Sequence, residues 1–451
     1  MHKESSFDLP SMGRPLHLSM PIKVAGLPPE QPALIEAITR DQRDIPWTAR
    51  AHYNTSKTGT IDTSVAPSLS GSYVGLDPDG LFWSAQPPGM DDYLAGLHGD
   101  PQLPLSPGPF DCDDLVVDLA VRVEGHVLCR HQLRRPQIAA NVAVTKALPD
   151  PLRGELFEPE NAAAKGTVLV LGGSEGGIVA SRAAALAAEG YCALALGYFA
   201  YADRPQAAIN LPLEYFAQAV AMLHQRTGKN VVIWGGSRGS EAAMLTAIHF
   251  PKHIAGVIAW VPSHLVNCGF DMLGGEDFSI STTAMWALDD HSIEGAPMLP
   301  VSDDLLSARG AGYSAPPGYA YSPEFEAIWQ AAGQDSDYTI CVEKLAGELC
   351  IISAQDDQLW PSALGGDILF KRRKHHGLAA RTRHICLANA GHAIGMPNMA
   401  RPYSHLTYWS GGYSGVPEGF VSLGGTPVDN AAAARDGWAA AIDFLRDVFD
   451  D

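Results

Sequence analysis

The stretch from Gly235 to Gly239 carries the residues best suited to covalent chemistry. It reads Gly-Gly-Ser-Arg-Gly, with Ser237 at its centre, between the apolar run 231–234 and the helix-forming run 241–245. A serine flanked by glycines between a strand and a helix is typical of a nucleophile elbow, because the sharp turn strains the serine backbone and crowds its neighbours. We therefore predict that Ser237 is a nucleophile.

A second stretch, Gly172 to Gly176, satisfies the same pattern with Ser174 at its centre. Ser174 lies on the first strand-to-helix turn of its domain, and two further strands intervene before Ser237. In α/β-hydrolases the earlier loop carries an oxyanion donor and the later one carries the nucleophile. We predict that the backbone N–H groups of Ser174 and Arg238 form the oxyanion hole, with Glu175 as the alternative to Ser174. The other interpretation of this loop is a plain glycine turn that caps a helix.

Two acids and a histidine further along the chain complete a possible catalytic set. A serine hydroxyl needs a base to activate it and a third group to orient that base. Asp356 and Asp357 follow an apolar run, and His392 follows the last such run. Asp357 is preferred because it lies three residues after the small Ala354, which leaves Asp356 as a turn or cap residue. The order Ser, Asp, His is that of α/β-hydrolases, so we predict a triad of Ser237, Asp357 and His392.

The elements that must position these residues alternate in the second part of the chain. Continuous apolar runs bounded by glycine are separated by Ala-rich helical stretches, which is typical of a parallel α/β sheet. The predicted strands are 167–171, 192–196, 230–234, 256–260, 348–352 and 384–387, and the predicted helices are 178–188, 213–225, 241–249, 362–374 and 431–448. We predict an α/β-hydrolase domain over residues 149–451. Its stretch 262–345 breaks the alternation and is interpreted as a lid-like insertion.

Residues 1–148 follow a different pattern. Short segments, clearest over 117–123, alternate apolar and polar residues and are broken by Gly, Pro, Asn and Asp turns. This pattern predicts an amino-terminal antiparallel β-sandwich. The only helical period in this part is a weak one over 33–39, and residues 149–165 are expected to form a polar connection.

Composition limits the classes of partner. The 451 residues are 46% hydrophobic and 18% charged, with a net charge of -19, so binding to nucleic acid is not expected. The seven scattered cysteines lack metal-ligand spacing and are expected to be free thiols. There is no signal-peptide pattern and no run of roughly 18 apolar residues, which predicts a cytoplasmic protein without a membrane span.

On these residues and motifs the chain resembles the acyl-CoA thioesterase and bile acid-CoA:amino acid N-acyltransferase family over nearly its full length. The similar stretches are 22–29, 71–84, 172–177, the Ser237 elbow, 342–344, 356–362, 391–392 and 423–427. The resemblance implies a small-molecule acyl thioester as substrate, bound to coenzyme A or to a carrier, and a mechanism that needs no cofactor or metal. The basic run 371–376 is a solvated helix end or, alternatively, a patch for coenzyme A phosphates.

The resemblance leaves the acceptor of the acyl group open. Its amidating members use cysteine as nucleophile, whereas Ser237 favours hydrolysis by water through an acyl-serine intermediate. The alternatives are an acyltransferase or cyclase that passes the acyl group to an amine or hydroxyl, a carboxylic ester hydrolase, and a non-catalytic binding protein. Residues 264–338 match the family poorly, so acyl specificity is the least transferable inference.

Overall fold

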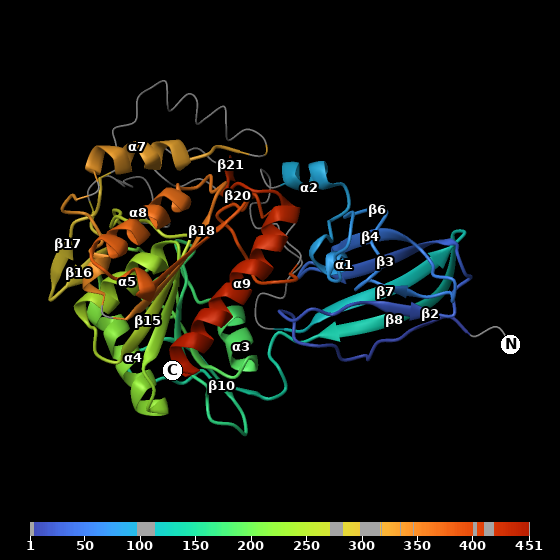
Figure 1. Cartoon of the computed structure of the whole chain (residues 1–451), viewed down its shortest axis with the longest axis horizontal. Coiled ribbons are helices and arrows are strands. Elements are labelled where there is room, and N and C mark those ends of the chain that lie inside the picture. The colour runs from blue at the N-terminus through green and yellow to red at the C-terminus, as the bar shows by residue number, and fades with distance from the viewer. Residues whose placement is uncertain are drawn as a thin grey trace. The chain divides into compact units, whose positions relative to one another are not determined.

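The structure is a computed structural model that describes residues 4–96, 113–270, 283–297, 316, 318–333, 335–345, 347–399, 404–409 and 419–450. The chain forms two compact units (Figure 1). The first comprises Met1–Ala140, Gly395–Ser404 and Pro427–Arg435, and the second comprises Asn141–Ile394, His405–Thr426 and Asp436–Asp451.

The first unit is built on antiparallel sheets. Its five-stranded sheet has the order β6-β4-β3-β7-β8, and its three-stranded sheet has the order β1-β2-β5. Side chains of β3 alternate between buried and partly exposed, as expected for a sheet with one face against a core. The strands are β1 (Ser6–Phe7), β2 (Lys23–Ala25), β3 (Pro32–Arg40), β4 (Pro46–Asn54), β5 (Ile61–Asp62), β6 (Ser70–Gly71), β7 (Leu115–Val123) and β8 (His126–Arg135), with helices α1 (Gly80–Trp83) and α2 (Met90–Gly96).

The second unit contains an eight-stranded sheet with the order β19-β18-β15-β14-β11-β12-β10-β9. Its six strands from β19 to β12 run parallel, and β10 pairs antiparallel with both β12 and β9. This is the strand arrangement of the α/β-hydrolase fold, so the predicted fold class is confirmed. The strands are β9 (Val142–Thr145), β10 (Gly154–Pro159), β11 (Thr167–Leu171), β12 (Cys192–Leu196), β14 (Val231–Gly236), β15 (Ile254–Trp260), β18 (Glu348–Ala354) and β19 (Thr382–Leu387).

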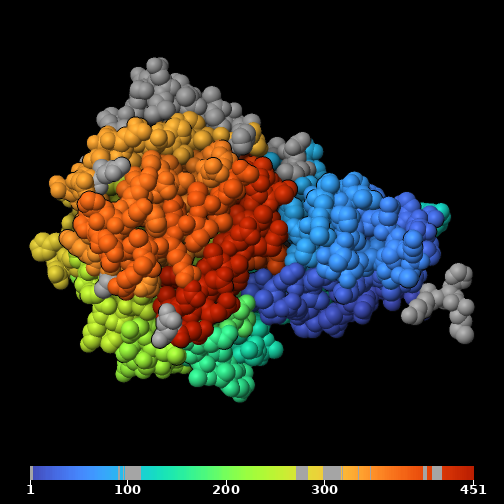
Figure 2. All heavy atoms as spheres, in the orientation of Figure 1, coloured from blue at the N-terminus to red at the C-terminus, as the bar shows by residue number. Residues whose placement is uncertain are grey.

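Helices cover both faces of this sheet, which explains its continuous apolar strands (Figure 1). Strand residues such as Ile233 and Ile351 share one buried cluster with residues of α4, α5 and α8. Trp234 instead contacts Trp438 of α9 and the guanidinium of Arg182 on α3. Figure 2 shows α8 in orange and α9 in red on the surface. The helices are α3 (Ala180–Ala188), α4 (Leu213–Thr227), α5 (Arg238–His249), α8 (Ser362–His375) and α9 (Pro427–Asp450).

Smaller elements lie outside the large sheet. They are β13 (Leu211–Pro212), β16 (Trp286–Leu288), β17 (His291–Ile293), α7 (Ser322–Ala332), the short 3-10 helices η2 (Val342–Lys344) and η3 (Ala379–Arg381), β20 (Leu406–Trp409) and β21 (Gly419–Ser422). The predicted lid-like insertion includes residues 271–282 and 298–315, which lie outside the described residues. Among the described helices, none combines the length and the apolar character needed to cross a membrane.

The expected polar connection over 149–165 is wrong, because it contains β10, which pairs with β12 and β9. The weak helical period over 33–39 falls within strand β3, where the apolar side chains alternate along a sheet buried on one face. β9 already belongs to the large sheet, although it precedes residue 149, the predicted start of the second domain.

Candidate active site

The turn between β14 and α5 has the geometry of a nucleophile elbow. Ser237 has a φ of 51° and a ψ of -120°, a conformation that non-glycine residues rarely adopt. A Cβ atom on Gly235 would lie 1.9 Å from the Gly239 carbonyl oxygen, and one on Gly239 would lie 2.2 Å from the Gly172 carbonyl oxygen. The turn therefore needs glycine on both sides, and it lies against the loop after β11.

The three predicted triad residues lie together at the carboxyl ends of three parallel strands. The Oγ atom of Ser237 is 3.1 Å from Nε2 of His392. The Nδ1 atom of the same histidine is 2.9 Å from Oδ2 of Asp357. The histidine side chain is 10% exposed and the aspartate side chain 1%, so little water competes for the contact between them. A serine, an imidazole and a carboxylate at these distances can transfer a proton from the hydroxyl to the imidazole.

The two neighbouring acids make different contacts. Asp357 uses Oδ1 to accept hydrogen bonds from the backbone N–H groups of Leu359 and Trp360, which leaves Oδ2 for His392. Asp356 is exposed, and its Oδ2 accepts a hydrogen bond from the Gly425 backbone N–H. Of the two, Asp357 is the residue that the structure brings to the histidine.

Trp360 also belongs to this site, although no sequence motif marks it as functional. Its ring lies edge-on to that of His392, with 5.6 Å between the centroids. Its Nε1–H donates to the carbonyl oxygen of Val261 at 3.0 Å. Trp360 therefore packs against the histidine while it is held to the end of the neighbouring strand β15. A tryptophan three residues after the paired acid is the only signal that the sequence gives.

The loop after β11 lies beside the serine. A Cβ atom on Gly173 would be 3.0 Å from the Cβ of Ser237. The Gly173 N–H donates to Oε1 of the exposed Glu175 at 2.9 Å, and the hydroxyl of Tyr198 donates to the Gly172 carbonyl at 2.7 Å. Burial raises the pKa of Tyr198 well above its usual value, so this group remains a donor.

Ser174 lies on the same loop and is partly exposed. Arg238 is the first residue of α5, directly after Ser237, and the positive end of a helix dipole favours a developing negative charge there. The participation of both backbone N–H groups in an oxyanion hole stays a prediction.

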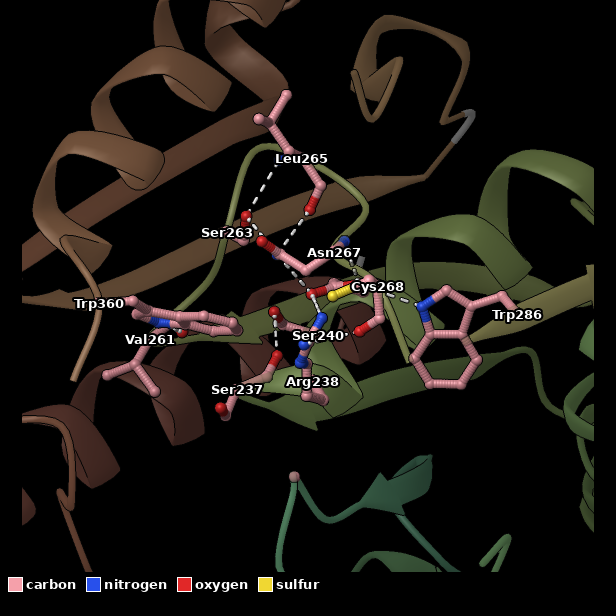
Figure 3. A network of polar contacts seen from close by, with 12 residues as sticks. Ser237, Arg238, Ser240, Val261, Ser263, Leu265, Asn267, Cys268, Trp286 and Trp360 are labelled. Carbon is pink, nitrogen blue, oxygen red and sulfur yellow. Dashed lines mark hydrogen bonds and ion pairs between the residues drawn. The ribbon is translucent and has the colours of Figure 1, made fainter. Parts of the chain in front are cut away.

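A buried polar network adjoins the serine (Figure 3). Oε1 of Glu241, on α5, accepts hydrogen bonds from Nη1 of Arg238 at 3.1 Å and from Nδ2 of Asn267 at 2.9 Å. Oε2 accepts from Nε1 of Trp286 at 3.1 Å. From sequence, Glu241 marks only the start of a predicted helix. The sequence signal for a special role was that Glu241 is an acid followed by the apolar run 242–245, which is expected to be buried.

A second contact of serine, histidine and aspartate occurs in the same unit. Oγ of Ser353 is 2.8 Å from Nε2 of His384, whose Nδ1 is 3.3 Å from Oδ1 of Asp367. Ser353 is completely buried within β18. Burial also lowers the pKa of His384. This set joins α8 to the sheet, and no substrate can reach its serine without unfolding that packing.

Some cations of the basic run at the end of α8 form contacts within the fold. Arg372 forms ion pairs with Glu343 and Asp335. Arg373 is fully buried, and its guanidinium donates to four backbone carbonyls and to the hydroxyl of Thr382. Two of the four cations in this run are therefore committed to the fold.

Both ends of the chain match a known family. Residues 18–145 match the region described as "Acyl-CoA thioester hydrolase/BAAT N-terminal region", and residues 321–451 match "BAAT / Acyl-CoA thioester hydrolase C terminal". Together these regions cover more than half of the chain. Asp357 and His392 lie within the second, whereas Ser237 lies between the two.

Relatives with similar names align along almost the whole chain. Human acyl-coenzyme A thioesterase 1 is 28% identical over 435 residues, which cover 94% of this chain and 92% of the relative. The human mitochondrial acyl-coenzyme A thioesterase 2 is 27% identical, with 94% and 80% covered. Mouse acyl-coenzyme A amino acid N-acyltransferase 1 is also 27% identical, with 94% and 93% covered.

Among solved structures, an esterase/lipase from an uncultured bacterium has a TM-score of 0.37 and 14% sequence identity, and covers 70% of this chain and 87% of its own. The fold assignment rests on the strand order described above. Because two regions match the family and the relatives align along almost the whole chain, the chain belongs to the acyl-CoA thioester hydrolase and bile acid-CoA:amino acid N-acyltransferase family of enzymes.

Proposed function

We propose that this protein hydrolyses the thioester bond of an acyl-CoA, or of a carrier-bound acyl group, with Ser237 as the nucleophile. The observation that supports this most directly is the chain of contacts from the serine hydroxyl through His392 to Asp357. The names of its relatives, acyl-coenzyme A thioesterases, support the choice of substrate. The free state of the six cysteines in the described residues agrees with the proposed cytoplasmic setting.

The reaction has two halves. In the first, Ser237 Oγ attacks the thioester carbonyl while His392 takes the hydroxyl proton. The carbonyl oxygen gains negative charge opposite the proposed N–H donors of Ser174 and Arg238. Collapse of the tetrahedral intermediate expels the thiol, which leaves with the proton from the histidine.

In the second half, water replaces the thiol. His392 takes a proton from the water molecule as the oxygen attacks the acyl-serine ester, and returns it to Ser237 when the carboxylic acid leaves. Asp357 holds the imidazole in one orientation and stabilises its protonated form throughout. Apart from the substrate and water, every group named in these steps belongs to this chain.

Acyl transfer to an amine is the second candidate, because one relative is named an amino acid N-acyltransferase. The two functions share the first half of the reaction and differ in the acceptor. An oxygen ester on Ser237 reacts less readily with amines than a thioester on cysteine does, which favours water. Adding amino acids to the assay and analysing the acyl product distinguishes the two.

The test is thiol release from a panel of acyl-CoA thioesters, with the acyl product followed by mass spectrometry. We expect free thiol and free acid from the wild-type protein, and loss of both in Ser237→Ala. Ser353→Ala is the matched control, since it removes another serine that is hydrogen-bonded to a histidine. It should keep its activity as long as it remains folded. Thiol release that survives Ser237→Ala would refute the mechanism.

A further inference from the structure

Glu241 is a buried carboxylate one helical turn after Ser237. Its side chain is completely buried, and four donors surround its two oxygens. They are Nη1 of Arg238 at 3.1 Å, the backbone N of Asn267 at 3.2 Å, Nδ2 of the same asparagine at 2.9 Å and Nε1 of Trp286 at 3.1 Å. An ion pair in such a place is costly to desolvate and gives weak evidence for stability. The role of Glu241 is therefore inferred from the residues that it holds in place.

The donors come from separate parts of the chain. Arg238 belongs to the elbow itself, whereas Asn267 lies on the stretch 263–270 after β15, and Trp286 begins β16. Arg238 adds a second link to this stretch, because its Nη2 donates to the Cys268 carbonyl at 2.8 Å. Figure 3 shows Arg238, Asn267 and Trp286 converging beside Ser237. We call residues 263–270 together with Trp286 the site wall.

Backbone hydrogen bonds connect the site wall to neighbouring stretches of the chain. Val266 donates to Tyr338 and accepts from Ala296, and His264 accepts from Ile340. Cys268 also forms a β-bridge with Ala284, two residues before Trp286. Movement of Asn267 would therefore be transmitted to stretches near residues 284, 296 and 340.

Aromatic rings of the site wall and of the loop after β18 lie near Arg238. The guanidinium of Arg238 lies 5.6 Å from the ring centre of Phe270, the last described residue of the stretch, and 5.8 Å from that of Trp360. Trp360 in turn packs on His392. The guanidinium that pairs with Glu241 thus lies near both rings.

We infer that Glu241 is a positioning residue that fixes the site wall relative to Ser237 and thereby sets which acyl chains the enzyme accepts. This inference rests on the proposed function, in which the acyl group is attached to Ser237. Glu241 touches none of the three proposed catalytic side chains in the described contacts, so it should affect the fit of the acyl chain more than the reactivity of the serine.

Glu241→Gln is the direct test, because it keeps the shape of the side chain but leaves one oxygen acceptor where four donors point. A buried mismatch of this kind also destabilises the fold. The double variant Arg238→Met/Glu241→Met separates the two effects. It removes both charges of the buried pair, so no unpaired charge is left, although the Asn267 and Trp286 donors lose this acceptor. Its unfolding midpoint is therefore measured beside its labelling.

Arg373→Met is the control for a purely structural loss. It removes an equally buried arginine of the same unit, whose guanidinium binds backbone carbonyls around η2 and η3. We expect it to lower the unfolding midpoint without any change in substrate preference.

The measurement is the rate at which Ser237 is labelled by an ethyl and by a hexadecyl fluorophosphonate, alongside kcat/KM for short and long acyl-CoA thioesters. In Glu241→Gln, labelling by the ethyl probe should stay within about threefold of wild type. The double variant also changes Arg238, a proposed oxyanion donor, so only the ratio of its two labelling rates is compared. The ratio of hexadecyl to ethyl labelling should change by roughly tenfold or more, since small displacements of a binding surface have effects of this size. Arg373→Met should keep the wild-type ratio.

The outcomes separate the two hypotheses. An unchanged ratio in folded Glu241→Gln and in the double variant would refute the role of Glu241 while leaving the proposed function intact. A changed ratio in an enzyme that cleaves no thioester would support the role of Glu241 and refute the proposed substrate. If wild-type Ser237 is labelled by neither probe, both proposals fail.

Discussion

Asp356 and Asp357 are adjacent in sequence, yet only Asp357 is directed at the histidine. Its carboxylate is nearly buried and accepts from two backbone N–H groups as well as contacting His392. Asp357→Asn would present an amide N–H or a neutral oxygen to the imidazole and favour the wrong tautomer. We predict a fall in kcat on the order of 10³–10⁴-fold, measured by thiol release.

Asp356→Asn serves as the comparison, since its asparagine oxygen can still accept from the Gly425 N–H. We expect less than about a threefold change, because this contact joins two loops that are 69 residues apart in sequence and does not meet the histidine. Should Asp356→Asn lose activity while Asp357→Asn keeps it, the assignment of the acid would have to be reversed.

His264 predicts a pH dependence of stability. It is 1% exposed, neither ring nitrogen has a hydrogen-bond partner among the residues that the structure describes, and burial lowers its pKa from 6.5 to about 4. The folded protein therefore resists protonation at pH values where the unfolded chain accepts a proton. His264 does not lower the free energy of unfolding above pH 6.5. Its destabilising contribution grows as the pH drops below 6.5 and reaches its full size once the pH passes below about 4.

Between pH 7.5 and pH 5, His264 should cost the folded state about 2 kcal/mol. The check is urea unfolding at both pH values for wild type and His264→Phe, which keeps a ring against Trp329 but cannot titrate. The variant should lose less stability over this interval than wild type. Equal losses in the two proteins would show that His264 is protonated in the folded state or titrates normally.

The close contact between the loop after β11 and the elbow predicts that one added methyl group on this loop disturbs the serine. A Cβ atom on Gly173 would lie 3.0 Å from the Cβ of Ser237 and 3.2 Å from the Gly236 carbonyl oxygen, so one of the two turns must shift. Gly173→Ala should slow labelling of Ser237 roughly 10- to 100-fold, because catalytic geometry tolerates only small displacements.

Gly177→Ala is the control for this change. It lies on the same loop with a φ of 67° and open space around its Cβ position. An alanine there is strained by about 1–2 kcal/mol in the left-handed region, so stability should fall while labelling stays close to wild type. Equal slowing in both variants would mean that the β11 loop acts through stability alone.

The core strands of the large sheet could be predicted from sequence because both of their faces are buried. The predicted strands 167–171 and 192–196 coincide with β11 and β12. The antiparallel strands β9 and β10 were missed, since β9 has only four residues and β10 mixes polar and apolar residues without a continuous apolar run. Helix α5 was predicted to begin at 241 and begins at Arg238, because glycine and serine after the elbow conceal its first turn.

The site was predictable only in part for a related reason. Ser237, Asp357 and His392 follow apolar strands at one edge of a parallel sheet, so their chain order predicts that they meet. Glu241 and Trp360 have partners far along the chain, and no local pattern specifies a contact such as Glu241 with Trp286. Contacts of this kind depend on how the stretch between β15 and β18 returns to the sheet.

For the whole molecule, the net charge of -19 opposes a polyanionic substrate. Repulsion between exposed charges extends over about 30 Å at 0.01 M salt and about 8 Å at 0.15 M. If the proposed substrate is an acyl-CoA, its kcat/KM should rise severalfold over this range of ionic strength as the repulsion is screened. The corresponding thioester of N-acetylcysteamine carries no phosphates, and its kcat/KM should stay nearly constant. A decrease for the acyl-CoA would instead reveal a local cationic surface strong enough to outweigh the net charge, and Lys371 and Lys374 on α8 would be the first residues to replace.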